Sequence, residues 1–91
     1  MQVRLKLVRP FRDAVGKPEV AFAPRRANLV EALGELVEAY PGLREHLFEG
    51  GGLSPYVNIY LNGAVVHVDE AAKHTLRDGD ELLFLLPLTG G

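Results

Sequence analysis

Apolar and charged residues alternate at the start of the chain. From residue 3 to residue 7, Val and Leu take every second position, and Arg and Lys take the positions between them. This period of two predicts a strand with one buried face. A second short alternation over residues 19–22 stops before Pro24. Because the two strands are close in sequence, we expect an antiparallel hairpin with a long loop over about residues 10–17.

The spacing of apolar residues then changes to that of a helix. The residues that recur every three or four positions are Leu29, Leu33, Leu36, Val37 and Tyr40. They predict one amphipathic helix. Asn28 is a suitable N-cap, and Glu31 three residues later fits a capping box. Pro41 and Gly42 end the helix. Gly34 costs such a helix about 1 kcal/mol relative to Ala, and we interpret it as a point of close packing on a sheet.

A glycine-rich segment and a hairpin follow the helix. Residues 49–52 are expected to form a flexible loop, because consecutive glycines restrict the backbone very little. Residues 56–61 alternate clearly and predict a strand. Asn62-Gly63 is a strong hairpin signal, so residues 64–68 are expected to return as the next strand.

The last part of the chain predicts a central strand. Residues 82–86 form a nearly continuous apolar run after a tight turn at Asp78-Gly79. Such a run is typical of a strand covered on both faces, and we place it beside the first strand. One helix packed across one mixed sheet of four to five strands buries all these faces. The pattern therefore predicts an α+β fold in a single domain over residues 1–91, with a flexible tail over residues 87–91.

Composition and charge exclude several classes of function. The chain is 47% hydrophobic and 24% charged, as in ordinary globular proteins. A formal charge of −2 with scattered basic residues argues against nucleic acid and anionic membranes as partners. No segment approaches the roughly 18–20 apolar residues that cross a bilayer. The absence of cysteine excludes disulfides and a catalytic thiol, and it is compatible with the cytoplasm, where we expect the protein.

The side chains predict neither a metal site nor a stand-alone catalyst. His46, His67 and His74 lack the spacing of metal ligands, so we interpret them as surface or hydrogen-bonded residues and expect no metal and no cofactor. The acidic residues of the 78–81 turn are interpreted as turn formers, with contact to a basic partner as the alternative. No nucleophile and base are recognisable as a pair.

Four stretches of the sequence, in order, resemble the β-grasp (ubiquitin-like) sulfur carriers of the MoaD and ThiS kind. They are residues 11–17, residues 28–33 followed by 40–43, residues 57–63, and residues 76–82 running on to 87–91. The last stretch is specific, because an Asp-Gly-Asp-Glu turn, an apolar strand and a final Gly-Gly occur at the family's spacing. Leu86 departs from the pattern, since many members have a second proline there. The resemblance implies the same fold that the periodicity predicts.

The resemblance also implies that the carboxyl group of Gly91 is the functional group. Two glycines at a chain end arise by chance with a probability of about 0.5%. A segment without Cβ atoms fits a narrow channel, so Gly90 is interpreted as giving access to Gly91. In the family, an ATP-dependent activating enzyme (MoeB-like) adenylates the last glycine, which then becomes a thiocarboxylate. The large subunit of molybdopterin synthase (MoaE-like) directs that sulfur onto the pterin precursor.

An apolar strip near the carboxyl end predicts an interface with such partners. Phe84, Leu86 and Leu88 alternate, and they supply more apolar surface than one buried face needs. The candidate contact residues are Phe11, Leu86, Leu88 and Thr89. A place in the core explains Phe11 equally well.

Other functions remain open at this level. The preferred interpretation is the non-catalytic, sulfur-donating small subunit of molybdopterin synthase in molybdenum cofactor biosynthesis. A carrier for thiamin or for tRNA thiolation, or a protein modifier attached to lysines, uses the same activated tail. A different class is a β-grasp interaction domain without transfer chemistry. Every one of these functions except the last requires an activating enzyme to activate the carboxyl group of Gly91.

Overall fold

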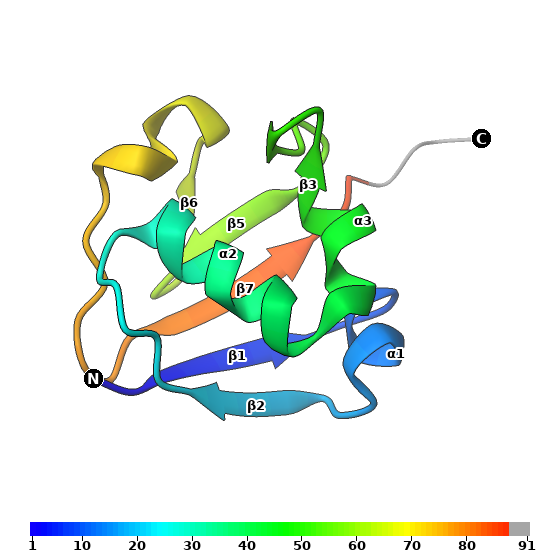
Figure 1. Cartoon of the computed structure of the whole chain (residues 1–91), viewed down its shortest axis with the longest axis horizontal. Coiled ribbons are helices and arrows are strands. Elements are labelled where there is room, and N and C mark those ends of the chain that lie inside the picture. Colours follow the sequence, from blue (N-terminus) through cyan, green and yellow to red (C-terminus); the bar gives the residue numbers. More distant parts are fainter. Residues whose placement is uncertain (88–91) are drawn as a thin grey trace.

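The computed structural model describes residues 1–87, and its centre is a five-stranded mixed sheet crossed on one face by one main helix (Figure 1). The strands are β1 (Val3–Leu7), β2 (Glu19–Phe22), β5 (Asn58–Leu61), β6 (Ala64–Val66) and β7 (Glu81–Leu85). Their order is β2-β1-β7-β5-β6, with β1 and β7 parallel and the other pairs antiparallel. This is the predicted β-grasp fold, with the last strand beside the first.

The helical segments connect and cover this sheet. They are α1 (Phe11–Val15), α2 (Leu29–Ala39), α3 (Arg44–Leu47) and two 3₁₀ segments, η1 (Pro41–Leu43) and η2 (Val68–Lys73). α1 occupies the loop of the β1–β2 hairpin, which explains the length of that loop. The expected strand over residues 64–68 is shorter, because the chain turns into η2 after β6.

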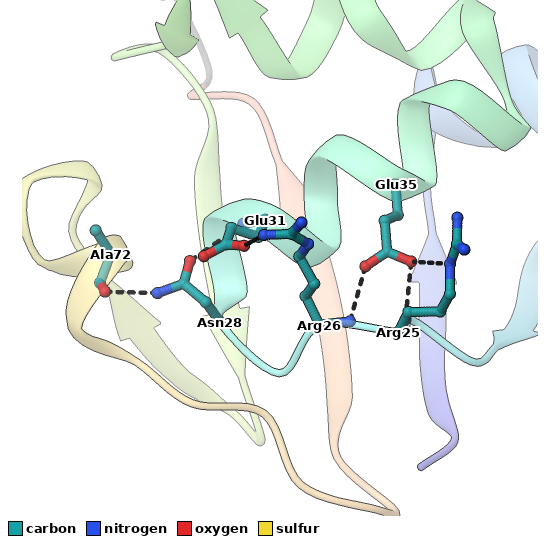
Figure 2. Close-up of polar contacts among 6 residues, drawn as sticks. All are labelled: Arg25, Arg26, Asn28, Glu31, Glu35 and Ala72. Carbon is teal, nitrogen blue, oxygen red and sulfur yellow. Dashed lines mark hydrogen bonds and ion pairs between the residues drawn. The ribbon is translucent and has the colours of Figure 1, made fainter.

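The start of α2 confirms its predicted cap (Figure 2). The Asn28 side chain accepts a hydrogen bond from the Glu31 N–H at 3.1 Å and donates one to the Ala72 carbonyl at 2.7 Å. Asn28 therefore ties the helix to η2 as well as capping it. Only half of the capping box forms, because the Glu31 carboxylate accepts a hydrogen bond from Arg26 Nη1 at 2.6 Å instead.

The core lies between α2 and the sheet. α2 contributes the buried residues Leu29, Ala32, Leu33, Leu36 and Val37. They face alternate residues of the central strands, whose inward side chains are fully buried as well. The apolar residues that the helix period and the strand period predicted to be buried thus pack together in one cluster.

The glycine-rich segment is a defined hairpin, which corrects the prediction of a flexible loop. β3 (Phe48–Glu49) pairs with β4 (Gly52–Leu53), and two residues connect them. Gly50 and Gly51 have φ values of 61° and 88°. Both central positions of a type I′ turn need positive φ, and glycine adopts it without steric cost. The glycines that predicted a flexible backbone are therefore needed for one tight turn.

Two predictions about packing were wrong. A Cβ atom added at Gly34 meets nothing within 4 Å, so this glycine is not a point of close packing on the sheet. β7 is not covered on both faces either: Leu82 and Phe84 are buried, whereas Leu83 and Leu85 are partly exposed. α2 covers one face of the sheet, and no described element covers the other in the same way (Figure 1).

Candidate functional site

The candidate site is the point where the chain leaves the sheet after β7. β7 lies in the middle of the sheet, between β1 and β5. Its last paired residue is Leu85, opposite Asn58. Leu86 and Pro87 follow and are exposed. Since four ladder pairs on each side hold β7, the base of the carboxyl-terminal segment has a fixed position and direction.

Phe84 anchors this base in the core. Its ring is fully buried and lies 5.6 Å from that of Phe11, which α1 supplies. Phe11 also meets His46 edge-to-face at a centroid distance of 5.7 Å. Phe11 has no exposed surface, which corrects its candidate role as a partner contact. Of the two interpretations that the sequence allowed, the structure supports the core residue, because α1 folds Phe11 inward under the end of β7.

Three exposed apolar side chains gather where the chain leaves the sheet. β1 and β7 are parallel, so their carboxyl ends lie at one edge, and β5 begins there because it is antiparallel. Val8 directly follows β1, Tyr56 precedes β5 by two residues, and Leu86 follows β7. Their exposed fractions are 39%, 65% and 39%. This end of the sheet therefore offers apolar surface around the start of the tail, as an interface requires.

The apolar surface continues across the uncovered side of the sheet, which we call the open face. Strand register places Val65 opposite Tyr60, and Tyr60 opposite Leu83. Val65 is 46% exposed, and the other two are half-buried. Val65, Tyr60 and Leu83 were not among the contact residues predicted from the sequence. The signal was present, because they are apolar at positions where the alternation of each strand points away from the core.

Charged residues border the open face on β1. Lys6 lies opposite Leu83, and Arg4 lies opposite Glu81. The Glu81 carboxylate is 3.4 Å from the Arg4 guanidinium and 3.6 Å from the Lys6 ammonium group. These pairs are solvent-exposed, so each contributes little to stability. They leave basic side chains beside an apolar strip, a combination suited to orienting a partner protein.

The acidic turn before β7 has a structural role, as the sequence suggested. Asp78 accepts a hydrogen bond from the Gln2 N–H at 2.7 Å. Asp80 accepts one from the Arg77 N–H at 2.8 Å and another from the Asn62 amide group at 2.9 Å. Asp80 thus joins the turn that leads into β7 to the turn of the β5–β6 hairpin, at the end of the sheet opposite the exit of β7.

Neither metal chemistry nor a membrane span has support in residues 1–87. The described residues contain no group of three His, Asp or Glu side chains placed to hold a metal ion. None of their helices has the length and apolar character to cross a bilayer. Leu88, Thr89, Gly90 and Gly91, predicted from the sequence as contact and working residues, lie outside the described residues.

These features define a ubiquitin-like β-grasp protein with its carboxyl-terminal segment leaving from the central strand of the sheet. The model of the ThiS family matches residues 5–91, and the chain belongs to this family. The resemblance to MoaD and ThiS proteins is confirmed at that level.

Two solved structures and one curated relative give the family its context. Small archaeal modifier protein 3 of Haloferax volcanii is 34% identical, and the match covers all of both chains. The crystal structure of small archaeal modifier protein 1 from the same organism is 27% identical, covers all of both chains and has a TM-score of 0.83. A Pyrococcus furiosus protein assigned as molybdopterin converting factor subunit 1 is 26% identical, with coverage of 97% and 99% and a TM-score of 0.73.

Proposed function

We propose that this protein is a ubiquitin-like carrier whose Gly91 carboxyl group is activated with ATP and then transferred to a nucleophile. The observation that carries the proposal is the fixed exit of β7, surrounded by exposed apolar side chains, directly before a Leu-Thr-Gly-Gly end. A partner can bind the well-positioned end of β7, and its active-site channel can admit the two final glycines because they have no side chains. The single domain with a flexible tail over residues 87–91 is part of this proposal.

The chemistry needs activation because a carboxylate is a poor electrophile. A Gly91 carboxylate oxygen attacks the α-phosphorus of ATP, pyrophosphate leaves, and an acyl-adenylate forms. Sulfide can then attack the carbonyl carbon, so that AMP leaves and a thiocarboxylate remains. A lysine amine can attack the same carbon, in which case AMP and a proton leave and an isopeptide bond forms. The described residues of this chain supply the scaffold, and the activating enzyme supplies the catalytic groups.

Attachment to lysine is the better supported use of the activated tail. The relative that matches over the full length of both chains is named a modifier protein, and so is the structure with a TM-score of 0.83. Sulfur donation to the pterin precursor, our preferred interpretation from the sequence alone, is the second candidate. The similarity to the Pyrococcus furiosus protein favours it. Both uses begin with the same adenylate, and one protein can serve both.

The open face and the exit of β7 are the proposed docking surface for the activating enzyme. Val8 and Leu86 lie at the carboxyl ends of β1 and β7, and the strip through Leu83 and Val65 extends the apolar surface across the open face. Leu88 and Thr89 are proposed to line the path of the tail into the enzyme. The same surface would receive a MoaE-like large subunit in the second candidate function. We place the protein in the cytoplasm, where ATP and such enzymes are available.

Intact-mass analysis tests the activation step. The protein is incubated with ATP, sulfide and a purified MoeB-like activating enzyme. We expect a mass gain equal to the replacement of one oxygen by sulfur, and no gain when Gly91 is deleted. Leu86→Ala should slow the reaction without unfolding the protein, since this side chain is exposed. An equal gain in the protein lacking Gly91 would refute the proposal.

Peptide mapping separates the two uses. The last trypsin site before the end of the chain is Arg77, so a conjugated lysine would carry residues 78–91 as its tryptic remnant. Finding this remnant on other proteins supports the modifier function. A thiocarboxylated protein that forms no conjugates but converts the pterin precursor with a large subunit supports the sulfur donor. Failure of both, with no adenylate formed, leaves a plain interaction domain.

A further inference from the structure

A second surface lies on the helix side of the molecule, away from the open face. A groove of about 590 Å³ runs between α2 and the β3–β4 hairpin. Its walls include Glu35 and Glu38 of α2, Arg44 of α3, and Phe48 and Glu49 of the hairpin. We call it the helix groove. The proposed chemistry at Gly91 does not use it.

Three glycines line the helix groove. Gly34 lies on its α2 wall, and Gly50 and Gly51 form the hairpin turn on the other side. A Cβ atom at Gly34 would meet nothing within 4 Å, so the core does not demand this glycine. A glycine inside a helix nevertheless costs stability. The fold gives no reason for the missing side chain, and its absence leaves the α2 wall of the groove bare at this position.

The walls of the helix groove are acidic, and some of their carboxylates have no hydrogen-bond or ion-pair partner among the described residues. Glu31 pairs with Arg26, and the Glu35 carboxylate accepts hydrogen bonds from the backbone N–H groups of Arg25 and Arg26 at 2.8 and 2.9 Å (Figure 2). Those bonds hold the pKa of Glu35 below its ordinary value.

Glu38 and Glu49 are different, because both are exposed. Within residues 1–87 neither forms an ion pair or a side-chain hydrogen bond. Four carboxylates line the groove against two guanidinium groups, those of Arg26 and Arg44. The groove therefore has a net negative charge, and the exposed carboxylates of Glu38 and Glu49 are accessible to a ligand.

We propose that the helix groove binds a basic, extended segment of a partner protein. Lysine and arginine side chains combine an apolar stem with a cationic head. The half-buried ring of Phe48 and the bare backbone at Gly34 suit the stem, and Glu38 and Glu49 suit the head. Arg44 also lines the groove and repels a cation that comes near it, which favours an approach toward Glu38 and Glu49.

Amide chemical-shift mapping tests the groove directly. The probe is a short peptide of alternating arginine and glycine, with the glutamine-for-arginine peptide as its neutral counterpart. We expect saturable shifts at the amides of Gly34, Gly50 and Gly51 with the arginine peptide only. The pair Glu38→Gln and Glu49→Gln should weaken binding about tenfold, since two exposed charge pairs are lost.

Two controls keep the outcome decisive. The pair Asp69→Asn and Glu70→Gln removes the same charge from η2, away from the groove, and should leave the affinity within about twofold of the unchanged protein. Gly34→Leu leaves every charge in place but fills the groove, so it should abolish the shifts. Equal weakening in both double variants, or binding that survives Gly34→Leu, would overturn the proposal. Shifts that spread over all acidic surfaces, or no shifts at all, would do the same.

The proposal for the helix groove can be refuted without refuting the proposed function. The experiment needs neither ATP nor an activating enzyme, and it gives the same result with Gly91 deleted. If the protein is activated at Gly91 but does not bind the basic peptide, the carrier function stands and the groove proposal is refuted. A self-associating protein whose own segment fills the groove would show concentration-dependent shifts without any peptide, which also counts against the proposal.

Discussion

Replacing Gly34 by alanine is expected to stabilise the protein. The residue lies in the interior of α2, away from either cap. Alanine is favoured over glycine at such positions by about 1 kcal/mol, mainly because the unfolded chain loses conformational freedom. The new methyl group meets no atom within 4 Å, so no packing strain opposes the gain. The free energy of unfolding should rise by nearly the whole helix-propensity difference.

Thermal unfolding measures this effect. Unfolding entropy near the midpoint is about 2.1 cal/mol/K per residue, or about 190 cal/mol/K for this chain. A gain of about 1 kcal/mol then raises Tm by about 5 °C. Gly63→Ala is the matched control, because Gly63 has a φ of 84° that alanine rarely adopts, and it should lower Tm. An unchanged or lower Tm for Gly34→Ala would refute the argument that nothing in the fold requires this glycine.

Three further predictions concern the core, the helix cap and pH. Phe11→Ala should lower the free energy of unfolding by about 3–5 kcal/mol in urea titrations, whereas Leu86→Ala should change it by less than about 0.5 kcal/mol; similar losses would contradict the placement of Phe11 in the core. Asn28→Ala should cost about 1 kcal/mol, because the cap and the link to η2 are lost together, and an unchanged urea midpoint would count against the cap. The pKa of Glu35 is lowered by hydrogen bonds from the Arg25 and Arg26 backbone, so its stabilising effect is complete above the pKa of the unfolded chain and disappears as pH falls through the folded pKa. The stability difference between the protein and Glu35→Gln should therefore be larger at about pH 7 than at about pH 3, and a constant difference would disprove the role of this carboxylate.

The elements with local chemical signals could be predicted from the sequence. Asn28 caps α2 because its own side chain reaches the N–H group three residues later. Asn62 and Gly63 form the predicted hairpin turn, with φ values of 52° and 84°. Alternation placed β1 correctly for the same reason, since the strand period and the burial of every second side chain are properties of a few neighbouring residues.

The wrong predictions concern what lies opposite a residue, which local patterns do not contain. Gly34 was interpreted as touching the sheet, but the α2 face that carries it turns toward the helix groove. The apolar run of β7 suggested cover on both faces, whereas α2 covers one face and Leu83, on the other face, remains partly exposed. Phe11 was ambiguous because its burial depends on α1 folding back under Phe84, a contact across more than seventy positions.

The two surfaces lie on opposite sides of the sheet, and this arrangement has a consequence for how partners assemble. β7 ends beside the open face, so in the proposed function an activating enzyme that docks on this face approaches from the side opposite α2. α2 crosses the other face of the sheet (Figure 1), and the helix groove, which α2 lines, lies on that side. If both proposals hold, a basic partner in the groove and an activating enzyme on the open face can bind at the same time. Independent binding follows from the geometry: loss of Glu38 and Glu49 should leave the rate of Gly91 activation unchanged, and substitutions at Leu83 or Val65 should leave peptide binding unchanged. Coupled losses would mean that the sheet transmits an effect between its faces, because no described side chain belongs to both surfaces.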